Sequence, residues 1–208
     1  MNLPAHELLQ LRAVLHPLDA VPDGPGWNHA ELVGLLAPDA DLRQAAVLVG
    51  LVPRAHGIQV LLTRRNDALR HHAGQVSFPG GRIEPVDADA AAAAIRETGE
   101  EIGLMPEQIV PLGWLDPLVT ITGFRVLPLV AVITPDYQAR SDPREVDAVF
   151  EVPLAFLLAP GNLVQVEIQF GGRPRKVLEY VGQGQSGQRI WGATASILSN
   201  LRDRLARS

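Results

Sequence analysis

The most informative segment of this 208-residue chain covers residues 90–104 and reads AAAAAIRETGEEIGL. Alanine has the highest helix propensity of the amino acids, and the segment opens on a run of alanines. Asp87 or Asp89 can cap the first turn, and Gly103 can end the last one. We therefore predict a helix over residues 87–103.

Three glutamates of this helix crowd together. A helix advances by about 100° per residue, so Glu97, Glu100 and Glu101 share roughly one 100° sector. We expect the other side to pack on a sheet; its residues are Ala91, Ile95, Thr98 and Ile102. Like charges at this spacing repel by roughly 0.3 kcal/mol per pair. A hard divalent cation such as magnesium would offset that repulsion. A solvated acidic face is the commoner explanation of such a cluster taken alone.

The rest of the chain predicts strands interleaved with helices. Residues 45–52 form a continuous apolar run, which is typical of a strand buried on both faces, and residues 58–63 predict its hairpin partner. Further strands are expected over residues 75–78, 110–115, 125–133 and 148–152, and residues 163–170 and 176–181 predict an antiparallel pair around Gly171-Gly172. Further helices are expected over residues 8–15, 31–36, 153–158 and 191–206. This order predicts one mixed α/β domain over residues 45–208, preceded by a helical extension over residues 1–44.

The composition narrows the classes of function. A net charge of −5 gives no general attraction to nucleic acid or to an anionic membrane. The absence of cysteine excludes disulfides, thiolate nucleophiles and cysteine zinc sites. No stretch approaches the roughly 18 uncharged apolar residues that span a bilayer, and the N-terminus lacks a secretory signal pattern. We therefore expect a cytoplasmic protein that acts on a small molecule and binds neither nucleic acid nor membrane.

Gly81, a short acidic loop and the sequence RETGEEIGL at residues 96–104 resemble the Nudix box. In that family the box forms a loop–helix–loop whose glutamates bind the magnesium that engages a pyrophosphate. The resemblance implies a Nudix-type α/β/α sandwich with a mixed β-sheet. This chain departs from the family pattern at three points. The interval from Gly81 to Arg96 is one residue longer, Asp87 replaces the loop glutamate, and Thr98 replaces an aliphatic residue.

A second motif is similar to the coenzyme A pyrophosphatase branch of the Nudix family. It consists of LLTRRN at residues 61–66, Arg70, Gly74 and FPGG at residues 78–81, with Asn66 where serine is usual. Similar segments follow downstream: TGF at residues 122–124, EV at 145–146, FEVP at 150–153 and IWGATA at 190–195. The resemblance covers residues 45–201 and does not extend to the N-terminal extension.

The resemblance implies roles for the acidic residues. Glu97 and Glu101 are expected to be direct metal ligands, with Glu100 as a ligand or as a catalytic group that positions water. The Gly81 carbonyl is a further expected ligand. The catalytic base is either a glutamate of the box or a carboxylate from a later loop, and Glu145 resembles that later position. The expected cofactor is Mg²⁺, with Mn²⁺ as a substitute.

Substrate phosphates near this helix require cations. Arg64, Arg65 and Arg70 are placed to supply guanidinium groups, which match phosphate oxygens bidentately. His72 is a weaker candidate for a substrate contact. The alternatives are salt bridges at a strand end for Arg64 and Arg65, and a solvent-facing position for His72.

The resemblance implies hydrolysis of the pyrophosphate bond of coenzyme A or its derivatives, giving 3′,5′-ADP and 4′-phosphopantetheine. One alternative keeps the chemistry and changes the substrate to another nucleoside diphosphate derivative, such as ADP-ribose or NADH. A second alternative is a non-catalytic Nudix module that binds nucleotides. Three crowded acids argue against the second, since binding alone does not need them. The apolar side formed by Leu8, Leu11 and Leu15 leaves a homodimer open.

Overall fold

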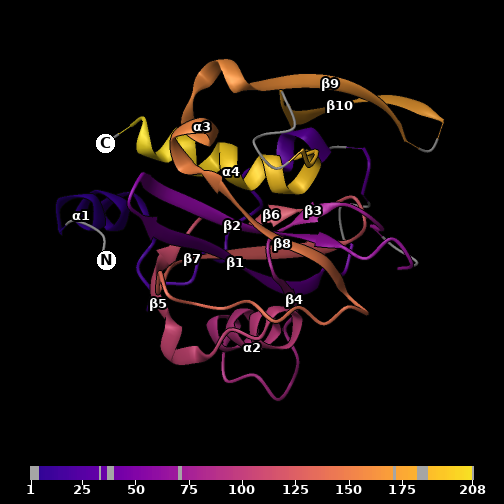
Figure 1. Cartoon of the computed structure of the whole chain (residues 1–208). Helices are drawn as coiled ribbons and strands as arrows, with labels where there is room; N and C mark the ends of the chain where they lie inside the picture. The colour runs from indigo at the N-terminus through magenta and orange to yellow at the C-terminus, as the bar shows by residue number, and fades with distance from the viewer. Residues whose placement is uncertain are drawn as a thin grey trace.

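A mixed β-sheet forms the centre of the molecule, and helices cover both of its faces (Figure 1). The computed structural model describes residues 5–32, 34–36, 40–69, 72–170, 172–181 and 187–207. Within these ranges the main sheet has eight strands in the order β3-β2-β1-β7-β5, with β4 beside β1, β6 beside β7 and β8 beside β2. The strands are β1 Arg43–Arg54, β2 Gly57–Arg65, β3 Val76–Ser77, β4 Gly80–Arg82, β5 Ile109–Trp114, β6 Leu118–Val119, β7 Phe124–Ile133 and β8 Val146–Pro153.

Strand β1 is the central strand and confirms the prediction from its apolar run. It runs parallel to β7 and antiparallel to β2, so the sheet is mixed, as predicted. Its residues 46, 48, 49, 51 and 52 are fully buried. A strand flanked by strands and covered on both faces has no solvent-facing side, which explains why its sequence is apolar without alternation.

The sheet divides along one side of β1. The second half of β1, from Gly50 to Arg54, pairs with the first half of β2. The first half of β1 pairs instead with β4, from Ala45 to Val47. Strand β2 continues away from β1 and pairs with β3 and β8. The end of β2 and the short strand β4 therefore diverge, and the space between them lies beside the predicted acidic helix.

Two separate cores pack the two faces. Helix α2, Ala90–Ile102, covers one face, with Ala93, Ala94 and Ile102 fully buried against it. Helix α4, Gly192–Leu205, covers the other face together with α3, Leu154–Leu158. The predicted α/β/α sandwich is confirmed.

The N-terminal extension packs on the α4 side of the molecule. Helix α1, Ala5–Val14, ends before Pro17 as predicted, and Leu11, Val14 and Leu15 are buried in the core that α4 covers. The helix expected over residues 31–36 is instead a short 3₁₀ helix, η1, His29–Leu32; residues 33 and 37–39 lie outside the described residues. A division of the chain at residue 44 stays a prediction.

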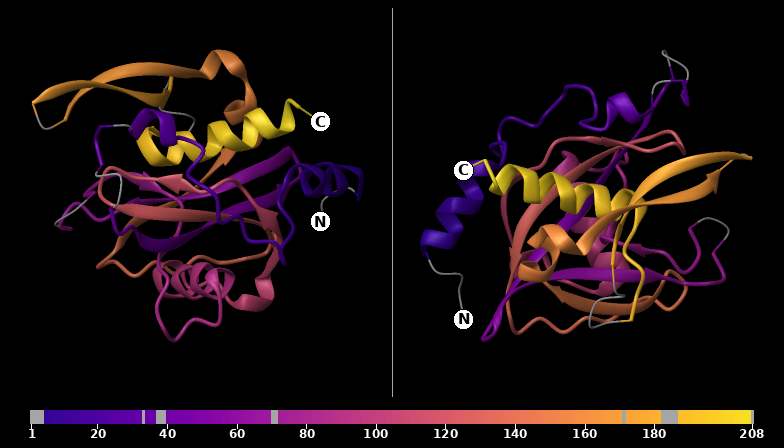
Figure 2. Two further views of the ribbon diagram at one scale, coloured as in Figure 1. Left: turned by 180° about the vertical axis from the view of Figure 1, so that it is seen from behind. Right: turned by 90° about the horizontal axis from the view of Figure 1, so that it is seen from above.

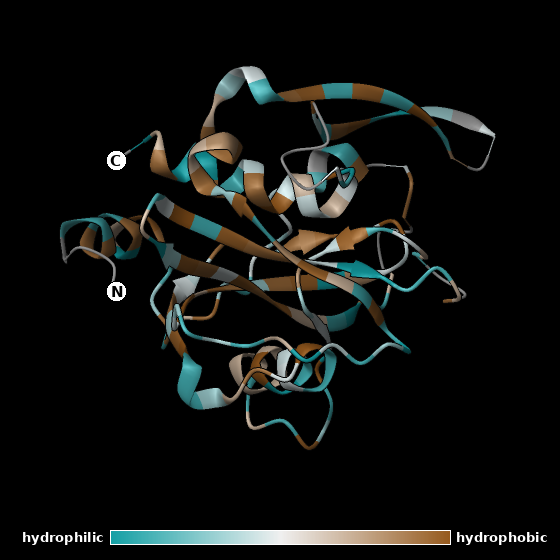
Figure 3. Ribbon diagram, in the orientation of Figure 1, coloured by the Kyte–Doolittle hydropathy of each residue, from teal (hydrophilic) through white to brown (hydrophobic). Residues whose placement is uncertain are grey.

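The strands predicted over residues 163–170 and 176–181 pair with each other, outside the main sheet. They are β9, Leu163–Phe170, and β10, Arg173–Tyr180, which form a two-stranded antiparallel hairpin. Figure 2 shows it projecting past the body of the molecule from above α4. Hydrophobic and hydrophilic residues alternate along it (Figure 3). The remaining elements are two 3₁₀ turns, η2 Pro106–Gln108 and η3 Pro160–Asn162. None of the described helices is long and apolar enough to cross a membrane.

Candidate active site

Helix α2 is capped at both ends by residues that the sequence suggested. The side chain of Asp89 accepts a hydrogen bond from the Ala92 N–H at 2.8 Å and forms the N-cap. Gly103 forms the C-cap with φ 71°, in the left-handed region that glycine tolerates best. The helix is therefore Ala90–Ile102, slightly shorter than the prediction over residues 87–103.

The prediction that the glutamates lie away from the sheet is wrong for one of them. Glu101 is only 3% exposed and lies on the buried side of α2, whereas Ala91 and Ile95 are half-buried. Glu97 is half-buried and Glu100 is exposed. The glutamates do share one sector, but that sector overlaps the face that meets the sheet. Glu101 can be buried there because β2 and β4 diverge beside it and leave backbone N–H and arginine groups to contact it.

Glu101 lies between the two diverging strands. Its Oε2 accepts a hydrogen bond from the Gly80 N–H of β4 at 3.2 Å, and its Oε1 lies 3.6 Å from Nη1 of Arg65 on β2. Burial raises the pKa of Glu101 to about 7, against the opposing effects of the Gly80 N–H and Arg65. A cation bound nearby would stabilise the charged form of Glu101 against the effect of burial.

Glu97 packs directly on Gly81. A Cβ atom at position 81 would lie inside the contact distance of the Glu97 carboxylate, so only glycine leaves room for that carboxylate at this point. Burial raises the pKa of Glu97; Arg96 opposes this shift, and the charges of Glu100 and Glu145 add to it. The carboxylate is thus held against the β4 backbone. Its contact with Gly81 fits the predicted role of both residues at a metal site, and that role stays a prediction.

Arg96 organises the acids around the start of the box. Its guanidinium donates to both Asp87 oxygens at 2.8 and 3.0 Å, to Glu97 Oε1 at 3.0 Å and to Glu100 Oε2 at 3.0 Å. The hydrogen bonds from Arg96, with a further one from the Glu84 N–H, lower the pKa of Asp87 to about 2. The pair of Arg96 and Glu100 follows from their spacing of four residues on one helix. The pair of Arg96 and Asp87 depends on the path of the loop between them.

The loop that carries Glu145 is attached to both sides of this site. The Asp142 N–H donates to the Glu101 carbonyl at 2.9 Å, which ties the loop to the end of α2. Asn66, directly after β2, donates from its backbone N–H to the Glu145 carbonyl at 2.9 Å and from Nδ2 to the Pro143 carbonyl at 2.5 Å. The charge of Glu145 raises the pKa of both Glu97 and Glu101, so its carboxylate lies near theirs. Sequence reasoning missed the role of Asn66 in holding this loop.

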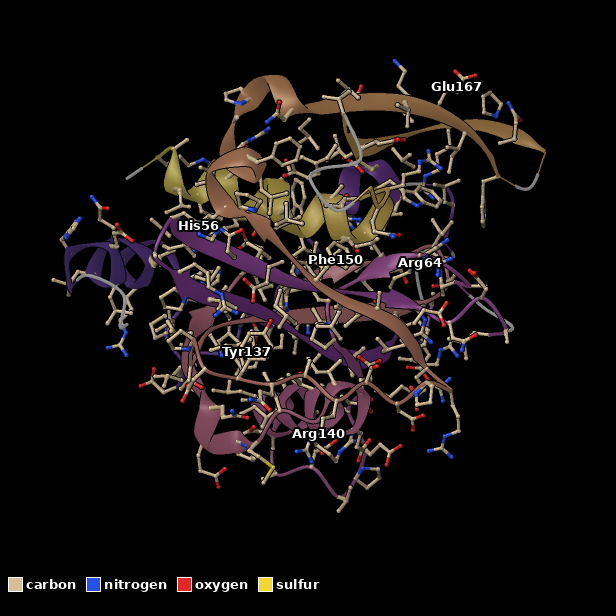
Figure 4. The ribbon with its side chains drawn as sticks, viewed as in Figure 1. His56, Arg64, Tyr137, Arg140, Phe150 and Glu167 are labelled. Carbon is tan, nitrogen blue, oxygen red and sulfur yellow. The ribbon has the colours of Figure 1, made fainter. Side chains whose placement is uncertain are left out.

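Arg64 and Arg65 are adjacent but have different surroundings. Figure 4 shows Arg64 at the end of the sheet opposite His56. Its guanidinium pairs with Asp67 at 2.6 Å and with Asp147 at 2.8 Å, at a bulge in the pairing of β2 with β8. Arg65 has only the longer contact with Glu101, and its buried Nε has no hydrogen-bond partner among the described residues. Arg65 therefore has donor capacity left for an anion.

The other two candidates for substrate contacts are less well defined. Arg70 lies outside the described residues, so its predicted contact has no structural account. His72 has φ 58° and its Nδ1 lies 2.9 Å from Gln75 Oε1. A substrate role for each stays a prediction.

The acids fit a hard divalent cation in chemistry. Their donors are carboxylate oxygens, which magnesium prefers, and burial disfavours the charge on Glu97 and Glu101 until a cation compensates it. Across the described ranges no three His, Cys, Asp or Glu side chains are grouped as they would be around a metal ion. Glu97 and Glu100 are instead held by Arg96, and Glu101 by Gly80 and Arg65.

Comparison with known proteins agrees with this geometry. The model of the NUDIX domain family matches residues 41–169, more than half of the chain. The Nudix hydrolase NudL of Klebsiella pneumoniae subsp. pneumoniae is 43% identical over 159 residues, which cover 76% of this chain and 81% of NudL. NudL of Escherichia coli K12 is 42% identical over 160 residues, with the same coverage. Both relatives are uncharacterized Nudix hydrolases.

Two solved structures align with part of this chain. The M. smegmatis Nudix hydrolase RenU aligns with a TM-score of 0.47 at 22% identity, over 54% of this chain and 71% of RenU. Protein DR0079 of Deinococcus radiodurans aligns with a TM-score of 0.48 at 15% identity, over 79% and 88%. The family match and the identity to NudL carry the assignment: this chain belongs to the Nudix hydrolase family and is a pyrophosphohydrolase whose box is the α2 segment with its flanking loops.

Proposed function

We propose that the protein hydrolyses the pyrophosphate bond of coenzyme A or its derivatives with magnesium as cofactor. Nudix hydrolases generally use divalent metal cations and act on nucleoside diphosphate derivatives. The observation that carries the proposal is the position of Glu97 and Glu101, which lie against β4 beside an arginine with an unused donor.

Glu97 and Glu101 would hold the cation, with Glu100 and the Gly81 carbonyl as further ligands. Bound there, magnesium neutralises charge on the phosphate oxygens and makes a water more acidic; manganese can replace it. Arg65 stabilises the same negative charge from the β2 side, because its guanidinium already lies 3.6 Å from Glu101. Arg64, Arg70 and His72 complete the proposed substrate contacts.

Water adds its oxygen to one phosphorus atom, and the bridging P–O bond breaks. Glu145 accepts the proton of that water, or Glu100 does so from the exposed side of α2. We favour Glu145 as the base because of its loop. Hydrogen bonds fix this loop both to the end of α2 and to Asn66, which keeps the Glu145 carboxylate near Glu97 and Glu101. For coenzyme A the products are 3′,5′-ADP and 4′-phosphopantetheine.

The choice of coenzyme A rests on the LLTRRN and FPGG motifs. The structure brings these motifs together, since Gly80 of the second donates to Glu101 while Arg65 of the first lies beside the same carboxylate. Hydrolysis of ADP-ribose or NADH would use the same acids and differ only in the pocket walls. A cytoplasmic location and a homodimer remain expectations from the sequence.

The test is a panel of coenzyme A, its acyl esters, ADP-ribose and NADH with magnesium or manganese, read by phosphate release with a coupled phosphatase. Coenzyme A should give the highest kcat/KM, and omission of metal should abolish turnover. Glu97→Gln should lower kcat by about two orders of magnitude or more while the protein stays folded. The matched control is Glu107→Gln, an exposed acid on η2, which should keep the wild-type rate. An undiminished rate for Glu97→Gln removes the proposed metal role.

A further inference from the structure

Two arginines gather on one phenylalanine at the end of the sheet where β1 and β7 begin and β4 ends. Cζ of Arg43 lies 3.9 Å from the centroid of the Phe124 ring, and Cζ of Arg82 lies 5.6 Å from the same centroid. Strand register places all three on one face, because Arg43 pairs with Phe124 and Arg82 pairs with Ala45, two residues further along β1. The Arg43–Phe124–Arg82 cluster is therefore built from three different strands.

Arg43 and Arg82 are among the arginines of the described residues that form no ion pair with a carboxylate. Arg54, Arg64, Arg65, Arg96, Arg144, Arg189, Arg202 and Arg204 each form an ion pair. Within the described ranges Arg43 and Arg82 form none; Arg43 donates one hydrogen bond to the Thr122 carbonyl at 2.8 Å, and the Arg82 guanidinium donates none. The guanidinium groups of Arg43 and Arg82 therefore keep most of their N–H donors available to an anion, although the protein as a whole has a net charge of −5.

The cluster lies next to the candidate active site along β4 but on the other face of the sheet, because Gly81 faces Glu97 on the α2 side whereas Arg82 and Phe124 face the α4 side. Arg82 directly follows Gly81, so its Cα lies about 3.8 Å from that of the residue on which Glu97 packs. Its backbone is also fixed to the site, because the Arg82 carbonyl accepts a hydrogen bond from Arg96 at 3.2 Å. A substrate with its pyrophosphate at Glu97 and Glu101 would pass around β4 to bring its nucleoside half to the Arg82 side chain.

We propose that Arg43 and Arg82 form a second phosphate site that binds a phosphomonoester on the nucleoside half of the substrate. This inference rests on the proposed function, because it takes the pyrophosphate to lie at the acids of α2. A phosphomonoester carries about −1.5 to −2 charges at pH 7 and three acceptor oxygens, which two guanidinium forks match. In coenzyme A that group is the 3′-phosphate. The site selects nucleotides that carry it over those that do not.

The test uses binding of two nucleotides that differ only in this group. Isothermal titration calorimetry on the full chain compares 3′,5′-ADP with 5′-AMP for the wild type, Arg43→Gln, Arg82→Gln and Arg12→Gln. The last is a matched control that removes an exposed arginine on α1, at the opposite side of the molecule from Arg64 (Figures 1 and 4). Wild type and Arg12→Gln should bind 3′,5′-ADP about tenfold or more tightly than 5′-AMP, and either cluster variant should lose most of that preference.

Kinetics supply a second readout. For coenzyme A the KM of Arg43→Gln and Arg82→Gln should rise about tenfold, while the KM for dephospho-coenzyme A, which lacks the 3′-phosphate, should change much less. Equal losses on both nucleotides, or a preference that persists in both cluster variants, overturn the second phosphate site and leave the proposed function standing. If coenzyme A is not hydrolysed by the wild type, the proposed function fails, and the calorimetry still decides whether the cluster recognises a phosphomonoester.

Discussion

Helices α2 and α4 cover opposite faces of one sheet, yet they bury different kinds of polar group. The buried polar side chains of α4 include Thr194 and Asn200, which are neutral and paired: Thr194 donates to the Val76 carbonyl, and Asn200 bonds to both the N–H and the carboxylate of Asp116. Helix α2 buries the neutral, hydrogen-bonded Thr98 and, in addition, the ionisable Glu101 with a raised pKa. Neutral satisfied groups stabilise a fold, whereas a buried carboxyl opposes folding when charged. The two helices therefore differ in one respect: α2 buries a carboxyl at the proposed metal site, and the named polar groups of α4 are neutral.

The substitution with the largest expected effect, and the strongest test of this comparison, is at Glu101. Glu101→Gln keeps an acceptor for the Gly80 N–H but removes the buried charge. Turnover should fall by about 100-fold or more, while the free energy of unfolding should stay the same or rise. Steady-state kinetics and urea unfolding measure the two. A large loss of stability with unchanged turnover would place Glu101 among structural residues like those of α4.

The second prediction concerns pH. The pKa of Glu101 is about 7 in the folded chain against 4.5 without its surroundings, so between these values the folded state binds more protons than the unfolded state. In the absence of divalent cations the stability from this group is therefore present below pH 4.5 and lost as pH rises to about 7. The loss is on the order of 3 kcal/mol.

The measurement is urea unfolding in a chelator from pH 4.5 to 8, on the wild type and on Glu101→Gln as the control. The difference between the two curves should show the fall, and added magnesium should reduce it, because a cation favours the charged carboxylate. A difference that stays flat over this range, or that rises with pH, contradicts the raised pKa.

The smallest effect is expected on α4. Asn200→Ala removes the acceptor for the Asp116 N–H and a donor to its carboxylate, so it should lower the free energy of unfolding by about 1–3 kcal/mol. Turnover at a temperature where the variant is folded should stay within about twofold of the wild type, since a lost hydrogen bond on this face does not reach the acids of α2. A variant that loses turnover more than stability would show that the two faces are coupled.

The sequence predicted the elements whose pattern is local. The alanine run with Asp89 and Gly103 defined α2, and the apolar run of residues 45–52 defined β1. It did not predict β4, because a strand of Gly80–Arg82 has no periodicity of its own and exists only through its pairing with β1. It correctly predicted that residues 163–170 and 176–181 pair with each other, but it did not show that this hairpin stays outside the main sheet, which depends on tertiary packing.

For the site, the sequence identified the acids and not their environments. Helical spacing correctly grouped Glu97, Glu100 and Glu101, but it could not reveal that the sheet divides beside them and admits Glu101 to the core. Motif similarity placed Glu145 as a candidate; the tie from Asn66 that fixes its loop depends on where the chain returns in space.

The loop before α2 keeps a firm attachment to the helix despite two departures from the family pattern. Aspartate is one methylene shorter than the glutamate that is usual in this loop, and the interval from Gly81 to Arg96 is one residue longer than usual. Asp87 nonetheless meets the guanidinium of Arg96 with both oxygens, and it also accepts a hydrogen bond from the Glu84 N–H. A single carboxylate therefore closes the loop on itself and ties it to the helix that carries Glu97 and Glu101.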